Sequence, residues 1–350
     1  MTANAMPVLR VRDLRVTYYT DAGRVAAVNG VSFDLAPGER LGLVGESGCG
    51  KSTLALALMR MIKPPGRIES GSAVVRTAQG EIDLLTLDEA AMRKVRLSVI
   101  SYIPQGAMNA LNPVLRVEQQ MLDALQAHMP QMPRREMLAR AEAALESVEL
   151  SRDVLRRYPH ELSGGMKQRV CIAIGILLSP RVIIADEPTS ALDVVVQRQV
   201  METLRRVQEQ LGASLILIGH DMGLMAQVAH RVAVMYAGQF VEISPVHAMF
   251  TQPLHPYAQA LIQSLPRLEN RGVFHGLPGM APSLLRLPSG CAFHPRCAYV
   301  MDACRREAPP TVSTPDGRLV QCYLYAAAKE GESAAMQERA SPQPQEGMRA

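Results

Sequence analysis

The chain of 350 residues contains no tryptophan, and aromatic residues make up only 4% of it. So few rings argue against a surface that stacks on nucleic-acid bases, and a net charge of +4 is too small to indicate binding to a polyanion. Long hydrophobic runs are also missing: the longest, residues 170–178, has nine residues, whereas a membrane-spanning helix needs about 20. The first ten residues lack the apolar core of a signal peptide. We therefore expect a cytosolic protein that binds no nucleic acid and reaches a membrane only through partners.

Short apolar runs alternate with helical patterns along most of the chain. Runs typical of buried strands occupy residues 40–44, 97–103, 181–185, 213–218 and 231–236. Helices are predicted at residues 51–61, 194–210 and 222–228. This alternation predicts crossover connections and a largely parallel α/β sheet. A longer helical pattern over residues 117–150 predicts a subdomain inserted at about 105–165.

The composition shifts toward proline after residue 244. We therefore divide the chain into a core, residues 1–245, and a loop-rich extension of different construction, residues 246–328. The remaining residues, 329–350, are polar and low in large apolar side chains, and we expect this tail to be disordered.

A glycine-rich loop follows the first of the core strands. Residues 45–52 read G-E-S-G-C-G-K-S and fit the pattern G-x-x-x-x-G-K-[ST] between a strand and a helix. Its glycines let backbone N–H groups converge on phosphate oxygens, and the helix N-terminus adds positive potential. Lys51 would reach the β- and γ-phosphates, and Ser52 would hold Mg²⁺. The predicted nucleotide-binding residues of the loop are Gly45, Ser47, Gly48, Cys49, Gly50, Lys51, Ser52 and Thr53.

Polar residues follow three further predicted strands. Beside the glycine-rich loop, Asp186 could bind Mg²⁺ through water and Glu187 could polarise an attacking water, which indicates hydrolysis rather than transfer to a bound acceptor. His220 could reach the γ-phosphate, and Gln105 could bind Mg²⁺ and the attacking water. Taken alone, the two acids could cap a turn, the histidine could be structural and the glutamine could lie in a loop.

A second glycine-containing string occurs at residues 162–169, L-S-G-G-M-K-Q-R. Ser163, Gly164 and Gly165 precede a predicted helix and can form another backbone cradle for an anion. One chain rarely needs two cradles for one triphosphate. Two chains arranged head to tail would place this cradle over the nucleotide held by the partner's glycine-rich loop.

These motifs, in this order over residues 9–243, resemble those of the ABC ATPases. The set comprises Walker A (45–52), the Q-loop (Gln105), the signature (162–166), Walker B (182–187), the D-loop (190–193) and the switch histidine (His220). The resemblance implies a P-loop NTPase (RecA-like) α/β core with an antiparallel β-subdomain and an α-helical signature subdomain. It also implies an aromatic ring that stacks on adenine near the end of the first strand, where Tyr18 and Tyr19 both fit and Tyr18 is preferred.

The strings H-P-Y at residues 255–257 and P-S-G-C-A-F-H-P-R-C at 288–297 look like the extension of dipeptide and oligopeptide importer ATPases. This resemblance implies an ATP-hydrolysing subunit, peripheral on the cytoplasmic face of the bacterial inner membrane. The implied partners are two transmembrane permeases, a second ABC ATPase (a homologous sibling rather than a copy of itself) and a solute-binding protein. Relatives with this extension also serve nickel, glutathione and other small solutes, so these remain alternatives. A soluble ABC ATPase of DNA repair or translation is a rival, although this chain lacks the usual second cassette or long coiled coil.

Four of the six cysteines lie in the extension, with the spacing C-x5-C-x6-C-x17-C: Cys291, Cys297, Cys304 and Cys322. Clustered thiols in a reducing cytosol indicate a metal site before disulfides. Structural zinc sites usually contain close C-x₂₋₄-C pairs. None occurs here, so the spacing favours a [4Fe–4S] cluster, with Zn²⁺ as the alternative. The resemblance implies the same cluster. The isolated Cys49 and Cys171 are expected to be packing residues.

Overall fold

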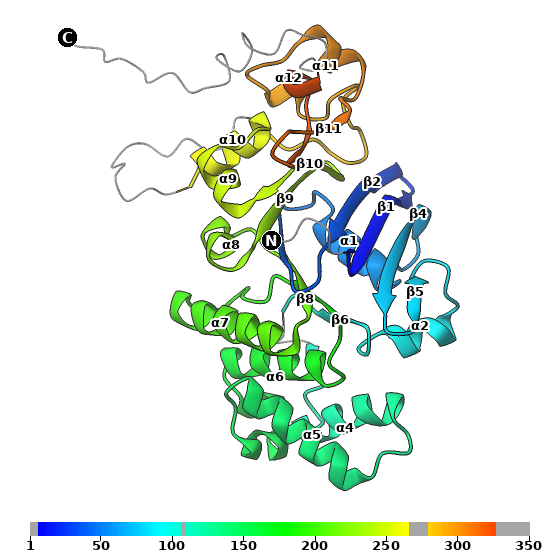
Figure 1. Cartoon of the computed structure of the whole chain (residues 1–350), viewed down its shortest axis with the longest axis vertical. Coiled ribbons are helices and arrows are strands. Elements are labelled where there is room, and N and C mark those ends of the chain that lie inside the picture. Colours follow the sequence, from blue (N-terminus) through cyan, green and yellow to red (C-terminus); the bar gives the residue numbers. More distant parts are fainter. Residues whose placement is uncertain (1–5, 107–109, 266–278, 327–350) are drawn as a thin grey trace, which may run out of the picture.

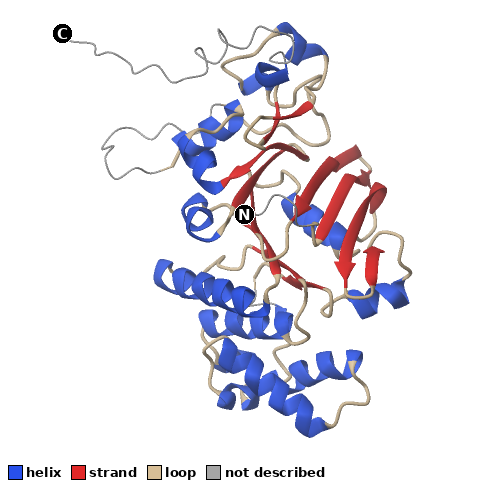
Figure 2. Ribbon diagram, viewed as in Figure 1, coloured by secondary structure: helices blue, strands red, loops and turns tan. Residues whose placement is uncertain are grey.

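Two β-sheets organise the part of the chain that the computed structural model describes, residues 6–106, 110–265 and 279–326 (Figures 1 and 2). The tail predicted to be disordered, residues 329–350, lies outside the described residues. No helix within the described ranges is long and apolar enough to cross a membrane.

The smaller sheet is antiparallel, with the strand order β2-β1-β4-β5. Its strands are β1 (Leu9–Thr20), β2 (Gly23–Leu35), β4 (Gly66–Thr77) and β5 (Gly80–Asp83). Apolar side chains of β1 such as Leu9, Val11 and Val16 are fully buried, while its polar residues alternate toward solvent. This sheet is the predicted antiparallel β-subdomain.

The larger sheet has eight strands in the order β11-β12-β10-β9-β3-β8-β7-β6. The short strands β11 (Thr311–Ser313) and β12 (Leu319–Gln321) form one edge. The five strands from β9 to β6 are parallel to one another, as the alternation of strands and helices predicts, and β10 pairs antiparallel with β9. Its core strands are β3 (Arg40–Val44), β6 (Ile100–Ile103), β7 (Val182–Asp186), β8 (Ser214–Ile218), β9 (Arg231–Tyr236) and β10 (Gln239–Pro245).

Both faces of the larger sheet are covered, which explains why its strands are almost continuously apolar. Successive side chains of β7 enter opposite cores: Ile183 and Ala185 belong to one hydrophobic cluster, and Val182 and Ile184 belong to the other. The flanking helices are α1 (Lys51–Leu58), α6 (Gly164–Ile176), α7 (Val194–Leu211) and α8 (Met222–Val228). Helix α2 (Glu89–Val95) follows β5 and lies beside it in Figure 1.

A helical subdomain projects from this core at the bottom of Figure 1. It contains α4 (Val117–His128) and α5 (Arg134–Ser147), joined to α6 by two short 3₁₀ turns. Met121, Leu125, Met137 and Leu145 line its interior and are buried, at the spacing of one face on each helix. The subdomain is the predicted α-helical insertion, and it places the signature residues at the start of α6.

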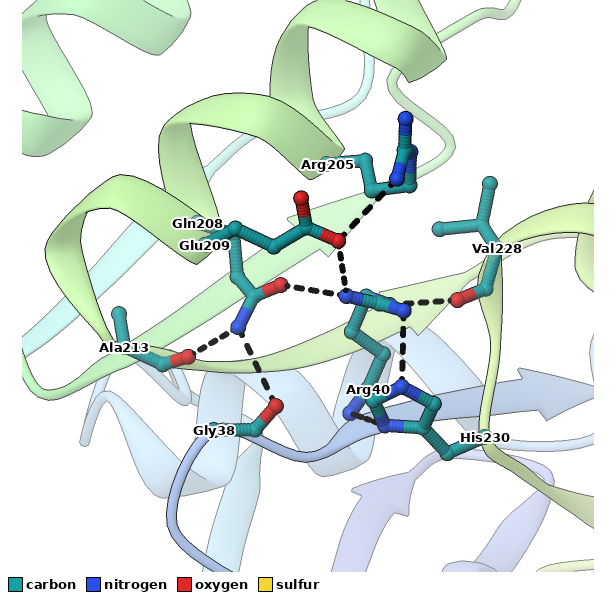
Figure 3. A network of polar contacts seen from close by, with 8 residues as sticks. All are labelled: Gly38, Arg40, Arg205, Gln208, Glu209, Ala213, Val228 and His230. Atoms are coloured by element: carbon teal, nitrogen blue, oxygen red, sulfur yellow. Dashed lines mark hydrogen bonds and ion pairs between the residues drawn. The ribbon is translucent and has the colours of Figure 1, made fainter.

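A polar network fixes the opposite, amino-terminal ends of the parallel strands (Figure 3). The guanidinium of Arg40, the first residue of β3, donates to the Val228 carbonyl at 2.6 Å, to Gln208 at 3.1 Å and to Glu209 at 2.9 Å. The ring of His230 lies against the same guanidinium, and burial, together with the charge of Arg40, lowers the His230 pKa. The network links β3 to α7 and to the segment between α8 and β9. It therefore holds the amino-terminal end of β3 in place, while the motif residues follow the carboxyl end of the strand.

The extension continues the core instead of standing apart from it. Its helices are α9 (Val246–Thr251), α10 (Pro256–Gln263), α11 (Asp302–Arg306) and α12 (Tyr323–Ala326), and its strands are β11 (Thr311–Ser313) and β12 (Leu319–Gln321). β12 pairs antiparallel with β10 and so lengthens the larger sheet. Met249, Tyr257 and Phe293 are buried in the same cluster as the cassette's own side chains. The composition changes at residue 245, but the sheet and the hydrophobic core do not stop there.

Candidate functional site

Four neighbouring strands of the larger sheet end at one edge, and each delivers predicted functional residues there. β3 leads into the loop 45–52, β6 is followed by Gln105, β7 ends at Asp186 before Glu187, and β8 is followed closely by His220. The strand order β3-β8-β7-β6 makes these chain ends adjacent. Ligands of open parallel sheets bind beyond the carboxyl ends of the strands.

The Walker A loop closes tightly around its own lysine. Lys51, the first residue of α1, is buried, and its ammonium donates to the carbonyl oxygens of Gly45 at 2.8 Å and Glu46 at 3.0 Å. Gly45 and Gly50 have φ of 150° and 110°, and a Cβ at either position would collide with a backbone carbonyl. Only glycine therefore lets the backbone follow this path beside β9 and β2.

Asp186 has the features of a cation ligand. The Tyr102 hydroxyl donates to its Oδ2 at 3.0 Å, while Oδ1 is buried and meets no hydrogen-bond donor among the described residues. Burial raises the Asp186 pKa, and the hydroxyls of Ser52 and Tyr102 partly oppose that rise. A buried carboxylate oxygen without a donor is costly unless a cation binds it. The predicted set of Ser52, Gln105 and Asp186 therefore fits Mg²⁺, which prefers oxygen ligands and one or two carboxylates.

Glu187 stands at the centre of the polar edge. Its backbone has φ of 43°, a left-handed conformation that is strained for a non-glycine residue. Gln105 Nε2 donates to its Oε2 at 2.7 Å, and His220 Nδ1 lies 3.7 Å from its Oε1. Gln105 and His220 thus lie on either oxygen of the Glu187 carboxylate, and the structure brings the three predicted catalytic side chains together.

The signature residues lie elsewhere. Ser163 caps α6, where its hydroxyl accepts from Met166 N–H at 3.3 Å, and Gly164 and Gly165 form the first turn. A Cβ on Gly165 would press against Val196. α6 is clearly separated from α1 in Figure 1, so this chain does not bring its second cradle to its own Walker A loop.

The two tyrosines at the end of β1 differ in their surroundings. Tyr18 is half-buried, and its ring packs on Gly66 and Ile62. Tyr19 is exposed, lies between the guanidinium groups of Arg24 and Arg67, and donates from its hydroxyl to Glu69 at 2.9 Å. The preference for Tyr18 as the ring that stacks on adenine stays a prediction.

The extension supplies contacts to the Walker A loop that sequence reasoning missed. The Glu46 backbone N–H donates to the Tyr257 hydroxyl at 3.0 Å, and the Arg296 guanidinium grips the Glu46 carboxylate at 2.8 and 3.0 Å. Both residues belong to the strings that indicate the importer resemblance, but nothing local to those strings reveals the contact. Tyr102 was also missed, because it sits in a strand whose pattern indicates only core packing.

The prediction of a metal centre in the extension is wrong. Among the described residues, which include all four cysteines, no three His, Cys, Asp or Glu side chains form a group that could hold a metal ion. Cys322 packs with Leu254 and Val320, and burial raises its pKa to about 12, while burial also raises the pKa of Cys291 and Cys297. Neither the [4Fe–4S] cluster nor the zinc alternative is supported. Cys304 and Cys322 are buried, while Cys291 and Cys297 are partly buried and pack against the larger hydrophobic cluster.

Two protein families match successive parts of the chain. Residues 28–190 match the family described as ABC transporter, and residues 241–304 match the oligopeptide/dipeptide transporter C-terminal region. A dimeric post-hydrolysis state of the ATP-binding cassette MJ0796, bound to ADP and Pi, is similar in structure, with a TM-score of 0.60 and 26% identity over 68% of this chain and 98% of that one. The fold is therefore that of an ABC ATPase.

Curated relatives extend the likeness over nearly the whole chain. A putative peptide import ATP-binding protein of Brucella melitensis is 42% identical over 88% of this chain and 94% of its own. The oligopeptide transport ATP-binding protein OppD of Salmonella typhimurium is 43% identical over 90% and 93%, and the dipeptide transport ATP-binding protein DppD of Caldanaerobacter subterraneus is 40% identical over 91% and 97%. Both the cassette and the extension are thus shared with these proteins, and the chain belongs to the ATP-binding proteins of the oligopeptide/dipeptide branch of ABC transporters.

Proposed function

We propose that this chain hydrolyses ATP to drive an ABC importer of di- and oligopeptides, bound peripherally at the cytoplasmic face of the bacterial inner membrane. The observation that carries the proposal is the meeting of Walker A, Asp186, Glu187, Gln105 and His220 at one edge of the sheet. The solute class rests on relatives described by peptide, oligopeptide or dipeptide transport, which favour peptides over nickel or glutathione.

In the proposed site, the backbone of residues 45–53 cradles the phosphates and Lys51 turns from the loop carbonyls to the β- and γ-phosphates. Bound Mg²⁺, held by Ser52, Asp186 and Gln105, would neutralise developing charge on the phosphates. Glu187 orients and polarises the attacking water. His220 approaches the γ-phosphate, and Tyr18 offers its ring to adenine.

The proposed partners follow from the second cradle. Ser163, Gly164 and Gly165 would cap the nucleotide held by a second ABC ATPase in a head-to-tail dimer, and we favour a homologous sibling over a second copy. Val194 and Val195, which follow the D-loop, are 80% and 68% exposed, as expected of apolar side chains that a partner covers.

Two transmembrane permeases would dock on the groove between the Q-loop and the helical subdomain, and a solute-binding protein would deliver the peptide.

The test combines a strain and an enzyme. A strain that lacks the chain and requires an amino acid should fail to grow on a peptide containing it, yet should grow on the free amino acid. Wild-type protein should restore growth, and Glu187→Gln should not. In the purified transporter, Glu187→Gln should keep ATP binding and lower hydrolysis at least about 100-fold, because the amide has the shape of the acid without its basicity.

Lys51→Ala is the matched control, since it should reduce ATP binding itself. Hydrolysis at the wild-type rate by Glu187→Gln would refute the catalytic assignment. Growth of the deletion strain on every peptide tried would refute the peptide substrate while leaving the ATPase intact.

A further inference from the structure

Glu46, the residue after the first glycine of Walker A, is held from three directions. Its N–H donates to the Tyr257 hydroxyl at 3.0 Å, its carbonyl accepts from Lys51 at 3.0 Å, and its carboxylate receives two parallel bonds from Arg296 at 2.8 and 3.0 Å. Two of these three partners come from the extension, so the extension fixes both the backbone and the side chain of this position.

The Arg296 side chain is buried among aromatic rings that hold its guanidinium beside Glu46. Its side chain is 5% exposed, while that of Glu46 is 24% exposed. The guanidinium lies 5.8 Å from the ring of Tyr236 and 5.9 Å from that of Phe293, and it also donates to the Tyr236 hydroxyl at 3.3 Å. These two rings contact Tyr257 and each other in tilted and edge-to-face arrangements and form one buried aromatic cluster. A two-pronged bond between arginine and a carboxylate adds geometric specificity to its strength.

The charge of Glu46 makes this contact matter for the nucleotide. A carboxylate in a phosphate-binding loop repels a triphosphate, and the repulsion is strong where water is partly excluded. Arg296 neutralises that carboxylate without occupying the loop, and the Tyr257 hydroxyl orients the adjoining peptide group. The Glu46–Arg296 pair therefore presents a nearly neutral side chain and a fixed backbone to the phosphates.

We propose that Arg296 and Tyr257 are positioning residues of the ATP site, through which the extension sets the affinity of Walker A for nucleotide. The inference rests on the proposed nucleotide site and adds a requirement: the cassette motifs alone do not give full affinity. Any displacement of the extension that separates Arg296 from Glu46 would weaken ATP binding. A change in the position of the extension would therefore change the affinity of the ATP site.

The test measures equilibrium binding of Mg·ATP to the full-length chain, together with the melting midpoint of each variant without nucleotide. Arg296→Gln, which leaves the Glu46 carboxylate uncompensated, should raise the Kd about tenfold. Adding Glu46→Gln to Arg296→Gln should return the Kd to within about threefold of wild type, because the repelling charge is gone. A role in packing alone would show no such rescue.

Arg318→Gln is the matched control within the extension. Arg318 is also a buried arginine, bonded to Asp316 and to the Gln252 carbonyl, and it does not contact Walker A. It should leave the Kd unchanged even where it lowers the melting midpoint. A wild-type Kd for Arg296→Gln, or a double variant no better than the single one, would overturn the inference.

Two milder variants cover the case in which Arg296→Gln does not fold. Arg296→Lys keeps the charge but cannot form two parallel bonds, and Tyr257→Phe keeps the buried ring but removes the acceptor for the Glu46 N–H. Each should raise the Kd severalfold, and wild-type affinity in both would overturn the inference. If the wild-type chain itself does not bind ATP, the proposed function fails, whatever these variants do.

Discussion

His255 shows how one buried side chain can make stability depend on pH. It is 1% exposed, it caps α10, and its Nδ1 accepts from the Tyr257 N–H at 3.0 Å. Burial lowers its pKa from 6.5 to about 3. The ring therefore stays neutral in the folded protein, and it anchors the helix that carries Tyr257.

Because the folded pKa of His255 lies below the unfolded one, the unfolded chain binds the extra proton as the pH falls below 6.5, and stability is lost down to about pH 3. The loss amounts to about 1.4 kcal/mol per pH unit. We predict that chemical unfolding at pH 7.5 and 5.5 will show this loss for the wild type. His255→Asn keeps a capping acceptor but does not titrate, so its stability should fall less over the same interval, while contributions of other groups such as His230 remain in both proteins. Parallel curves for the two proteins would contradict the prediction.

Elements differed in how far the sequence could predict them. The bounds of β3, β9 and α8 match the predicted ranges, because each is a short apolar run between clear turn residues. The hairpin β4–β5 and helix α2 were not predicted. β4 is half polar, and its apolar and polar residues do not alternate regularly. Gly71 interrupts the strand: its φ is 111°, and its Cα lies close against the backbone of β1. Its strand character comes from pairing with β1, which is not a local signal.

The same division holds within the site. Walker A, Walker B and the signature could be predicted because each is a contiguous string whose chemistry depends on neighbouring residues. The contact between Glu46 and Arg296 joins residues 250 positions apart. The four cysteines indicated a metal centre because they lie close together in the sequence, but spacing along the chain does not show whether folding brings their sulfur atoms to one point. Tertiary packing sets both the Glu46–Arg296 contact and the arrangement of the four cysteines, so neither could be predicted from the local sequence.

Helix α6 allows the second cradle to be tested apart from helix stability. Ser163→Asp keeps an N-cap acceptor for Met166, but it places a negative charge where the partner's nucleotide would lie. We predict that ATP binding to the isolated chain will stay within about twofold of wild type, and that hydrolysis by the assembled transporter will fall at least about tenfold. Ser163→Asn, an uncharged cap of the same size, is the control and should retain more activity. Equal hydrolysis by Ser163→Asp and Ser163→Asn would argue against the head-to-tail arrangement.

At the scale of the whole molecule, the extension is part of the cassette's core. β12 covers the edge of β10, and Met249, Tyr257 and Ala258 are fully buried against cassette side chains. We predict that a chain ending at residue 245 will melt at a lower temperature and associate in solution, because it exposes an unpaired strand edge and an apolar surface. Calorimetry and light scattering measure the two effects.

A chain ending at residue 326 is the control, since it keeps every described residue of the extension, and it should behave as the full-length protein does. A monomeric chain of 245 residues with an unchanged melting temperature would show that the extension is an independent unit after all.

The pairing of Glu46 with Arg296 also has a consequence in time. A ribosome makes Walker A among the first residues and Arg296 some 250 residues later, so a nascent chain holds every ATP-binding motif long before the loop's carboxylate has its counter-ion. β10 likewise waits as an open edge until β12 has been made. A polypeptide released early would carry a complete set of motifs with an unfinished site. If Arg296 sets the affinity of Walker A for nucleotide as we propose, such a truncated chain would bind nucleotide more weakly than the full-length one.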